Sequence, residues 1–265
     1  MSRTLLLVSV RCADEVATAV DGGAEIIDVK EPSHGSLGMA TLETLAACAV
    51  VVPEHLLWTV AGGELVEHKL VEHNESGSAA GQGVAEQGVA GSLHSLERLP
   101  DAIKFGLSQC EGTPWEHVFQ NVAEQLPQCV QAIPVAYADR QAANSPGVDT
   151  VLETAARHGW ETVLVDTFDK LQSGSLLNLV AVETIQQWVA QARDLGVRIV
   201  LAGRLSLQDV PVVAGCEPMA VAVRSAVCVG GRNGRVDIGL VRMVASECRS
   251  GFVQRGQDRI VRNTY

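Results

Sequence analysis

The chain of 265 residues carries a formal net charge of −11, and hydrophobic residues make up 47% of it. This acidic balance argues against nucleic acid or an anionic membrane surface as a principal partner, since both repel a negatively charged protein. Aromatic residues contribute only 4%, so we expect a core built mainly from Val, Leu, Ile and Ala, which suit strands buried on both faces.

Short apolar runs alternate with helical patterns along the chain. Eight runs are predicted as strands: Leu5–Val10, Glu25–Lys30, Leu56–Ala61, Ala102–Leu107, Ala132–Ala138, Thr162–Phe168, Arg198–Leu205 and Met219–Val227. Helix signals lie between and after them: Asp14–Val20, a start at Thr41, Trp115–Leu126, Val148–Arg157, Val182–Leu195 and Asp237–Cys248. Strands that alternate with helices over short links run parallel. We therefore expect an α/β fold, a single (β/α)₈ TIM barrel over residues 1–265.

One segment interrupts this alternation, an irregular insertion around residues 64–96. It contains His68, His73 and a stretch from Gly77 to Ser92 that is rich in Gly, Ala and Ser. The two histidines are five positions apart and do not share one helix face, so we expect a solvated loop here rather than a metal site.

The seven cysteines are odd in number and lack C-x-x-C spacing, which predicts neither a zinc site nor a disulfide framework. We expect reduced, mostly buried thiols in a reducing compartment. The run Leu5–Val8 is too short for the core of a signal peptide, and no apolar stretch reaches the ~18 residues of a membrane span. A soluble, cytoplasmic protein is expected, with apolar helix faces that leave room for a homo-oligomer.

The most informative motif places an acid and an amine in the second predicted strand. Side chains alternate faces along a strand, so Asp28 and Lys30 project together from the run Ile26–Lys30. Burying a lysine is costly unless it is paired or loses its proton. A partly neutral amine beside a carboxylate is what a Schiff-base enzyme needs, whereas a structural salt bridge is the alternative for an isolated pair.

Two further strands strengthen the catalytic interpretation. The fourth carries Lys104, and the sixth includes Asp166, with Lys170 just beyond its end. Even-numbered strands of an eight-stranded barrel contribute to the same interior layers, so Lys30, Lys104 and Lys170 are expected to converge at one mouth. Clustered ammonium groups lower one another's pKa and leave one amine free to attack a carbonyl, while the carboxylates move protons.

The ends of the last two predicted strands are rich in glycine and arginine. The candidate phosphate-binding residues there are Gly203, Arg204, Arg224, Gly230, Gly231 and Arg232. Loops at these places in a barrel often hold a phosphate with backbone N–H groups, which favours a phosphorylated substrate over mere tight turns. No G-x-G-x-x-G follows the first strand, and this weakens a dinucleotide-binding interpretation.

Several segments occur in the order that one known family shows, from residue 5 to residue 237. They are Leu6–Val10, Gly22–Pro32, Gly35–Gly38, Ile103–Leu107, Val165–Thr167 with Lys170, Leu201–Gly203, and Val223–Arg224 through Gly234–Asp237. Together they resemble the (5-formylfuran-3-yl)methyl phosphate synthase family, also called 4-(hydroxymethyl)-2-furancarboxaldehyde-phosphate synthase. The second-strand segment followed by Gly-Ser-Leu-Gly is specific. The chain departs from the family in the glycine-rich insertion and in Arg204, where a smaller residue is usual.

The resemblance implies a (β/α)₈ lyase that needs no metal or organic cofactor. It would condense two molecules of glyceraldehyde 3-phosphate into a phosphorylated furan aldehyde for methanofuran or a related one-carbon carrier. By position, Lys30 would be the Schiff-base lysine and Lys104 the proton acceptor, and Asp28, Asp166 and Lys170 would assist proton transfer and dehydration. Another class I aldolase-type barrel acting on a sugar phosphate, and a non-catalytic phosphometabolite-binding barrel, remain the alternatives.

Overall fold

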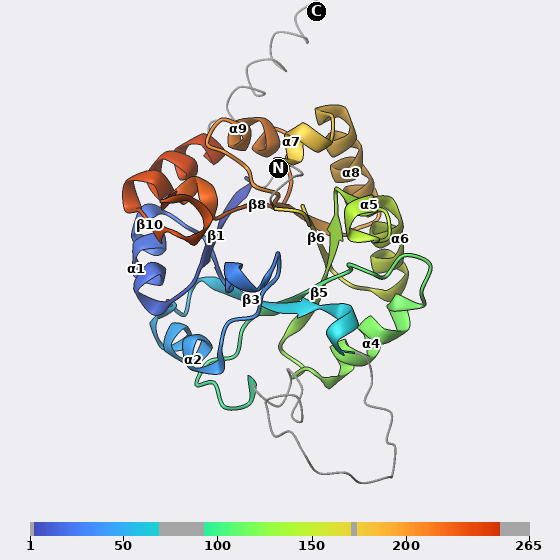
Figure 1. Ribbon diagram of the computed structural model, residues 1–265, viewed down its shortest axis with the longest axis horizontal. Coiled ribbons are helices and arrows are strands. Elements are labelled where there is room, and N and C mark those ends of the chain that lie inside the picture. The colour runs from blue at the N-terminus through green and yellow to red at the C-terminus, as the bar shows by residue number, and fades with distance from the viewer. Residues whose placement is uncertain (1–2, 69–92, 171–173, 250–265) are drawn as a thin grey trace, which may run out of the picture.

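Eight parallel strands close into a barrel in chain order, as Figure 1 shows for the computed structural model. The structure describes residues 3–68, 93–170 and 174–249. The strands are β1 Leu5–Val10, β2 Ile26–Val29, β3 Leu57–Glu64, β4 Ala102–Gly106, β5 Gln131–Tyr137, β6 Thr162–Asp166, β7 Arg198–Leu201 and β8 Ala220–Val223. Pairing of β1 with β8, with Leu5 opposite Ala220, closes the ring. The predicted (β/α)₈ barrel is confirmed.

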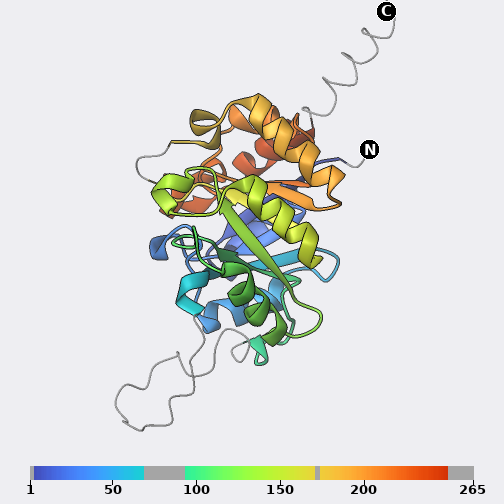
Figure 2. The same cartoon turned by 90° about the vertical axis from the view of Figure 1, so that its right-hand side faces the viewer.

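Helices cover the outside of the barrel, as the side view in Figure 2 shows. The longer ones are α1 Ala13–Gly22, α2 Leu42–Val51, α4 Trp115–Gln125, α6 Val148–His158, α8 Val182–Asp194 and a helix over residues 238–249. Each of these was predicted to within a few residues, except that for α2 only the start was predicted. The short helices α5 Arg140–Ala143, α7 Leu176–Leu179 and α9 Asp209–Ala214 were missed, because so few residues carry no readable helical period.

Local signals explain where the predicted helices begin and end. The hydroxyl of Thr41 accepts a hydrogen bond from the Thr44 backbone N–H at 3.2 Å and caps α2. Gly23 ends α1 at φ 102°, and Gly159 ends α6 at φ 72°. Both are left-handed conformations that glycine adopts without strain.

Two predicted strands, the seventh and the eighth, end four residues later than the real ones. β7 ends at Leu201 because Gly203, at φ 110°, turns the chain away from the sheet. β8 ends at Val223, and the short 3₁₀ helix η3 Ser225–Val227 follows it. The chain then forms a small hairpin of β9 Cys228–Val229 and β10 Arg235–Val236 around the 3₁₀ turn η4 Gly231–Asn233, an arrangement that the sequence did not predict. These early turns leave the loops after β7 and β8 at the barrel mouth.

β3 runs further than predicted, as far as Glu64, through an irregularity in its pairing with β4 between Ala61 and Glu64. The 3₁₀ helix η2 Leu65–His68 follows directly. His68 packs edge-on against Phe105 and hydrogen-bonds through Nε2 to the carbonyl oxygen of Gly62 at 2.7 Å. His73 and the stretch Gly77 to Ser92 lie outside the described residues.

The core has two parts, one inside the ring of strands and one between the strands and the helices. The inner part is built from small and aliphatic side chains, such as Ala61, Ala222 and Leu164. The outer part contains the aromatic cluster, in which the Phe119 ring lies 4.3 Å from that of Trp160 and 6.2 Å from that of Phe105. The seven cysteines all lie in the described ranges, where none forms a disulfide, and five of them are buried. In the described ranges no helix is long and apolar enough to cross a membrane.

Replacing Phe119 with alanine is expected to destabilise the barrel by about 3–5 kcal/mol, because a fully buried ring between two other rings is lost. Urea unfolding followed by circular dichroism measures this change. Phe119→Leu, which keeps most of the apolar volume, should cost much less. Equal stabilities of the two variants would contradict this account of the outer core.

Candidate active site

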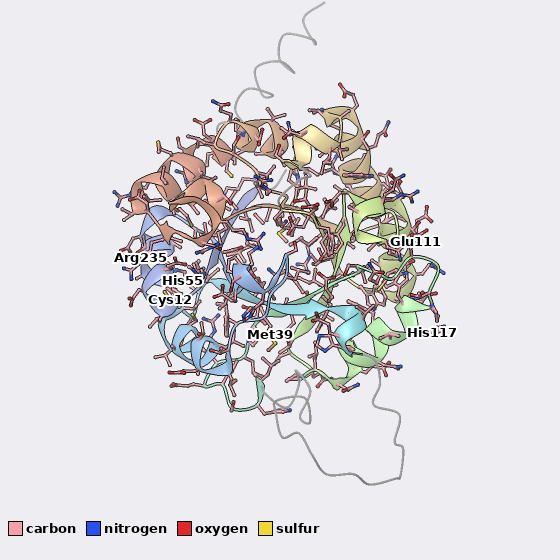
Figure 3. All side chains as sticks on the ribbon, viewed as in Figure 1. Cys12, Met39, His55, Glu111, His117 and Arg235 are labelled. Atoms are coloured by element: carbon pink, nitrogen blue, oxygen red, sulfur yellow. The ribbon has the colours of Figure 1, made fainter. Side chains whose placement is uncertain are left out.

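A single pocket at the carboxyl ends of the strands collects all five predicted catalytic residues. Asp28, Lys30, Lys104, Asp166 and Lys170 line it together. Side chains occupy the space inside the ring that the ribbon leaves open (Figure 3). The predicted convergence of lysines from the second, fourth and sixth strands is therefore present.

Four of the six candidate phosphate ligands also line this pocket, namely Gly203, Arg204, Arg224 and Arg232. Gly230 and Gly231 do not line it. They lie in the exposed turn between β9 and β10, at φ 85° and 74°, where glycine permits the tight bend. For Gly230 and Gly231 the structure therefore favours a tight turn over phosphate binding, the two interpretations that the sequence left open.

Asp28 forms the base of the pocket and is almost fully buried, at 1% exposure. Its Oδ1 receives hydrogen bonds from Lys104 Nζ and from Thr59 Oγ1 (2.9 Å), and its Oδ2 receives one from Ser9 Oγ at 2.8 Å. Burial by itself raises the pKa of Asp28, but the charges of Lys104 and Lys30 and the hydrogen bonds from Lys104 and Ser9 outweigh it and lower the pKa. The result is an ionised carboxylate in a fixed position.

A second carboxylate–lysine pair lies across the pocket. Lys170 Nζ donates to Asp166 Oδ1 at 2.6 Å and to Thr167 Oγ1 at 3.1 Å. Burial raises the pKa of Asp166, but the charges of Lys170 and Lys30 lower it overall. Burial also lowers the pKa of Lys170, although the Asp166 carboxylate opposes this. Asp166 is thus held ionised beside an amine that releases its proton more readily than a lysine in water.

Lys30 lies between these two pairs and belongs to neither. Within the described ranges its amine has no hydrogen bond or ion pair of its own, because Asp28 pairs with Lys104 and Asp166 with Lys170. The pKa of Lys30 is lowered to about 8, mainly by burial. The negative charges of Asp166 and Asp28 oppose this shift, and the positive charges of Lys104 and Lys170 add to it. At pH 7 about a tenth of the molecules therefore carry a neutral Lys30 amine.

Arg224 has a different environment from the one the sequence indicated. All five of its N–H groups have protein acceptors: the carboxylate oxygens of Glu15 at 2.9 and 3.3 Å, and the carbonyl oxygens of Ser9, Arg232 and Gly234 at 2.8–3.0 Å. Both side chains of this ion pair are buried. Arg224 therefore ties the loop after β8 to β1 and α1, and its contribution to the pocket is its charge.

Backbone donors remain at the mouth beside Arg224. In the described part of the chain, the N–H groups of Gly203, Arg204 and Ser225 donate no hydrogen bond. Arg232 donates from Nη2 to the carbonyl oxygen of Gly35 and so joins the loop after β8 to the loop after β2. This corner therefore combines free N–H groups with the guanidinium groups of Arg204 and Arg232.

Five polar residues of the site escaped sequence reasoning: Ser9, Thr59, Ser36, Glu64 and Tyr137. The first two hold Asp28, and Ser36 donates to Asp166 Oδ2 at 3.2 Å. Tyr137 donates to Glu64 Oε1 at 2.5 Å. Ser9 and Ser36 had a signal, since each lies in a segment that carries the family resemblance, whereas Thr59, Glu64 and Tyr137 are ordinary residues until the barrel closes. Among the described residues no cluster of His, Cys, Asp or Glu could hold a metal.

The chain is similar to proteins of one family over nearly its whole length. A family model described as 4-HFC-P synthase matches residues 6–245. The chain is 32% identical to the (5-formylfuran-3-yl)methyl phosphate synthase of Methanopyrus kandleri over 92% of its own length and 98% of that protein. It is 28% identical to the enzyme of the same name from Methanocaldococcus jannaschii, over 92% of its length and all of the relative.

Solved structures share the fold at low sequence identity. Phosphoribosyl anthranilate isomerase from Thermus thermophilus superposes with a TM-score of 0.59 at 11% identity, over 93% of this chain and 99% of that one. The 3-hexulose-6-phosphate synthase of Salmonella typhimurium gives a TM-score of 0.58 at 14% identity, over 94% of this chain and 100% of that one. At such identities the likeness shows the barrel alone.

Lys30→Met is expected to stabilise the protein below pH 8. The pKa of Lys30 is about 8 when folded and 10.5 as a free side chain, so the unfolded chain binds more protons between these values and stability rises with pH there. Below pH 8 Lys30 is charged in the folded protein, and keeping it charged there lowers the free energy of unfolding by about 3 kcal/mol. Urea unfolding at pH 7 should show a gain of that order, which disappears above pH 10.5.

Lys104→Met is the matched control, with the opposite sign. It leaves the buried Asp28 carboxylate without its ion-pair partner, which is expected to cost about 3–5 kcal/mol. If both variants lose stability at pH 7, the description of Lys30 as a lysine that the folded protein holds at a net cost is wrong.

Proposed function

The chain belongs to the 4-HFC-P synthase family, and on this premise we propose that it is a lyase making (5-formylfuran-3-yl)methyl phosphate from glyceraldehyde 3-phosphate. Two triose phosphates combine and lose one phosphate and two water molecules. The product would supply the furan part of methanofuran or a similar one-carbon carrier. The observation that carries this proposal is the Lys30 amine, partly buried between two carboxylate–lysine pairs with its pKa lowered to about 8.

The first step is imine formation at Lys30. Its neutral Nζ attacks the aldehyde carbon of one triose phosphate, and the carbonyl oxygen leaves as water. The resulting iminium carries a positive charge between Asp28 and Asp166, whose lowered pKa values keep them ionised and able to stabilise it. The iminium withdraws electrons from the neighbouring carbon and makes its proton acidic.

Proton removal at that carbon falls to the pair of Asp28 and Lys104. The resemblance assigns the role to Lys104, and in this pocket its amine is bound to the ionised Asp28, so the two act as one acceptor. Loss of the proton gives an enamine, which attacks the aldehyde of the second triose. Asp166 and Lys170 are placed on the opposite side and would protonate the oxygens that leave as phosphate and water.

The corner between β7 and β8 is the proposed phosphate site. The free N–H groups of Gly203, Arg204 and Ser225 and the guanidinium groups of Arg204 and Arg232 suit a phosphate. Ring closure and hydrolysis from Lys30 then release the furan, whose aromaticity draws the reaction forward.

Lys30→Arg is expected to abolish turnover and leave the fold intact, since a guanidinium keeps the positive charge but forms no imine. Incubation with glyceraldehyde 3-phosphate, assayed by phosphate release and by the ultraviolet absorbance of the furan, measures the loss. Measurable furan formation by this variant would remove the Schiff-base proposal. If the wild-type protein binds glyceraldehyde 3-phosphate but releases no phosphate and forms no product, it is a binding barrel. If it forms a product that lacks the furan absorbance, it is an ordinary aldolase.

Borohydride should trap the imine of the wild-type protein on one lysine. Mass spectrometry of the reduced protein is expected to place the adduct on Lys30, and its yield should rise with pH and level off above about 8, as the amine loses its proton. The adduct should survive in Lys170→Met. An adduct found on Lys170 alone would reassign the nucleophile.

A further inference from the structure

The turn between β9 and β10 presents three successive carbonyl oxygens to two arginine side chains. Arg224 donates from Nε to the carbonyl oxygen of Arg232 at 2.8 Å and from Nη2 to that of Gly234 at 3.0 Å. The carbonyl oxygen between them, that of Asn233, accepts from Nη1 of Arg11 at 3.1 Å. Arg11 directly follows β1 and was not among the predicted site residues. Two guanidinium groups therefore hold the backbone of the turn at three consecutive residues.

Carboxylates in turn hold Arg11. Its Nε and Nη2 both donate to Glu31 Oε2, at 3.2 and 3.0 Å. Its backbone N–H donates to Glu15 Oε2 at 2.7 Å, the same carboxylate that binds Arg224. Figure 3 labels Cys12, the neighbour of Arg11 in the chain, on the same side of the ring as the labelled residue of β10. The backbone and the side chain of Arg11 are thus both fixed beside the turn.

Glu31 also organises the loop after β2. Its Oε1 accepts from the backbone N–H of Ser33 at 2.9 Å and from the Ser33 hydroxyl at 2.7 Å, at the start of the 3₁₀ helix η1 Pro32–His34. The next residue, Gly35, has the carbonyl oxygen that accepts from the Arg232 side chain. The ion pair of Glu31 therefore reaches Arg232 from two sides, through the backbone of its turn and through the acceptor of its guanidinium.

We propose that Arg11 is a positioning residue for Arg232, an inference that rests on the proposed function of Arg232 as a ligand of the substrate phosphate. Arg232 lines the pocket of Lys30, but within the described ranges Arg11 does not, so it acts through the turn. The turn contains glycines at φ 85° and 74°, and an arginine side chain is long and flexible. Neither sets the direction of the guanidinium. Holding it before the substrate arrives reduces the freedom lost on binding and tightens the phosphate contact.

A similar ion pair at the other end of the same two strands provides a comparison. Arg3 precedes β1 and pairs with Glu25, which precedes β2, whereas Arg11 and Glu31 follow these strands. Both pairs join β1 to β2, but only the second is attached to a turn that carries a pocket residue. If such pairs served stability alone, removing either arginine would leave phosphate binding unchanged.

Arg11→Ala is expected to raise KM for glyceraldehyde 3-phosphate about 10-fold and to change kcat by less than about twofold, because a misdirected Arg232 weakens ground state and transition state alike. Arg11→Lys keeps the charge beside Glu31 but lacks the fork of donors, so its KM should lie between these values. In an Arg232→Ala background, Arg11→Ala should have no further effect, since it acts only through Arg232. The Kd of inorganic phosphate should follow the same pattern, and borohydride trapping on Lys30 at saturating substrate should stay at the wild-type level.

Arg3→Ala is the matched control and should leave KM, kcat and the Kd of phosphate unchanged, while circular dichroism checks that each variant is folded. If Arg11→Ala does not fold, the same comparison with Arg11→Lys decides. Wild-type KM in the Arg11 variant or in Arg232→Ala, or effects that multiply in the double variant, would overturn the role of Arg11 and leave the lysine chemistry standing. A wild-type protein that forms neither furan nor a Lys30 adduct would overturn the proposed function, and the phosphate series would then decide the role of Arg11.

Discussion

The whole site depends on one electrostatic constraint, the confinement of three lysines, one buried and two partly buried, beside the two carboxylates that the described residues place in the pocket. Asp28 pairs with Lys104 and Asp166 with Lys170, so the amine of Lys30 has charged neighbours but no hydrogen-bond or ion-pair partner among the residues that the structure describes. An unpaired ammonium is costly away from water, and the protein reduces this cost by letting Lys30 lose its proton readily. The feature that costs stability is also the one that supplies the neutral amine on which the proposed imine chemistry depends.

The barrel makes this arrangement possible because it brings distant strand ends to one point. Asp28 and Lys104 are 76 positions apart in the chain, yet their side chains meet at the centre of the ring. Ser9 and Thr59, from the strands on either side of β2, hold the same carboxylate. A rigid sheet thus places acids and amines with a precision that loops alone would not give.

A second buried ion pair organises the loops around the pocket. Arg224 and Glu15 are 209 positions apart, and the guanidinium also binds carbonyl oxygens of the turn after β9. Through that turn Arg232 reaches the loop of Gly35 and Ser36. The corner suited to phosphate and the loop of Ser36, whose hydroxyl donates to Asp166, are therefore connected through a shared framework of hydrogen bonds.

The sequence by itself determined the eight strands, the longer helices and the side of β2 on which Asp28 and Lys30 lie, because periodicity and end signals are local. Only the tertiary structure decided which charged and polar side chains pair with each other. Asp28 binds Lys104 rather than Lys30, Arg224 binds Glu15, and Tyr137 meets Glu64 across 73 positions. These contacts depend on the register and closure of the barrel, and no local pattern in the chain records which strand ends will face each other.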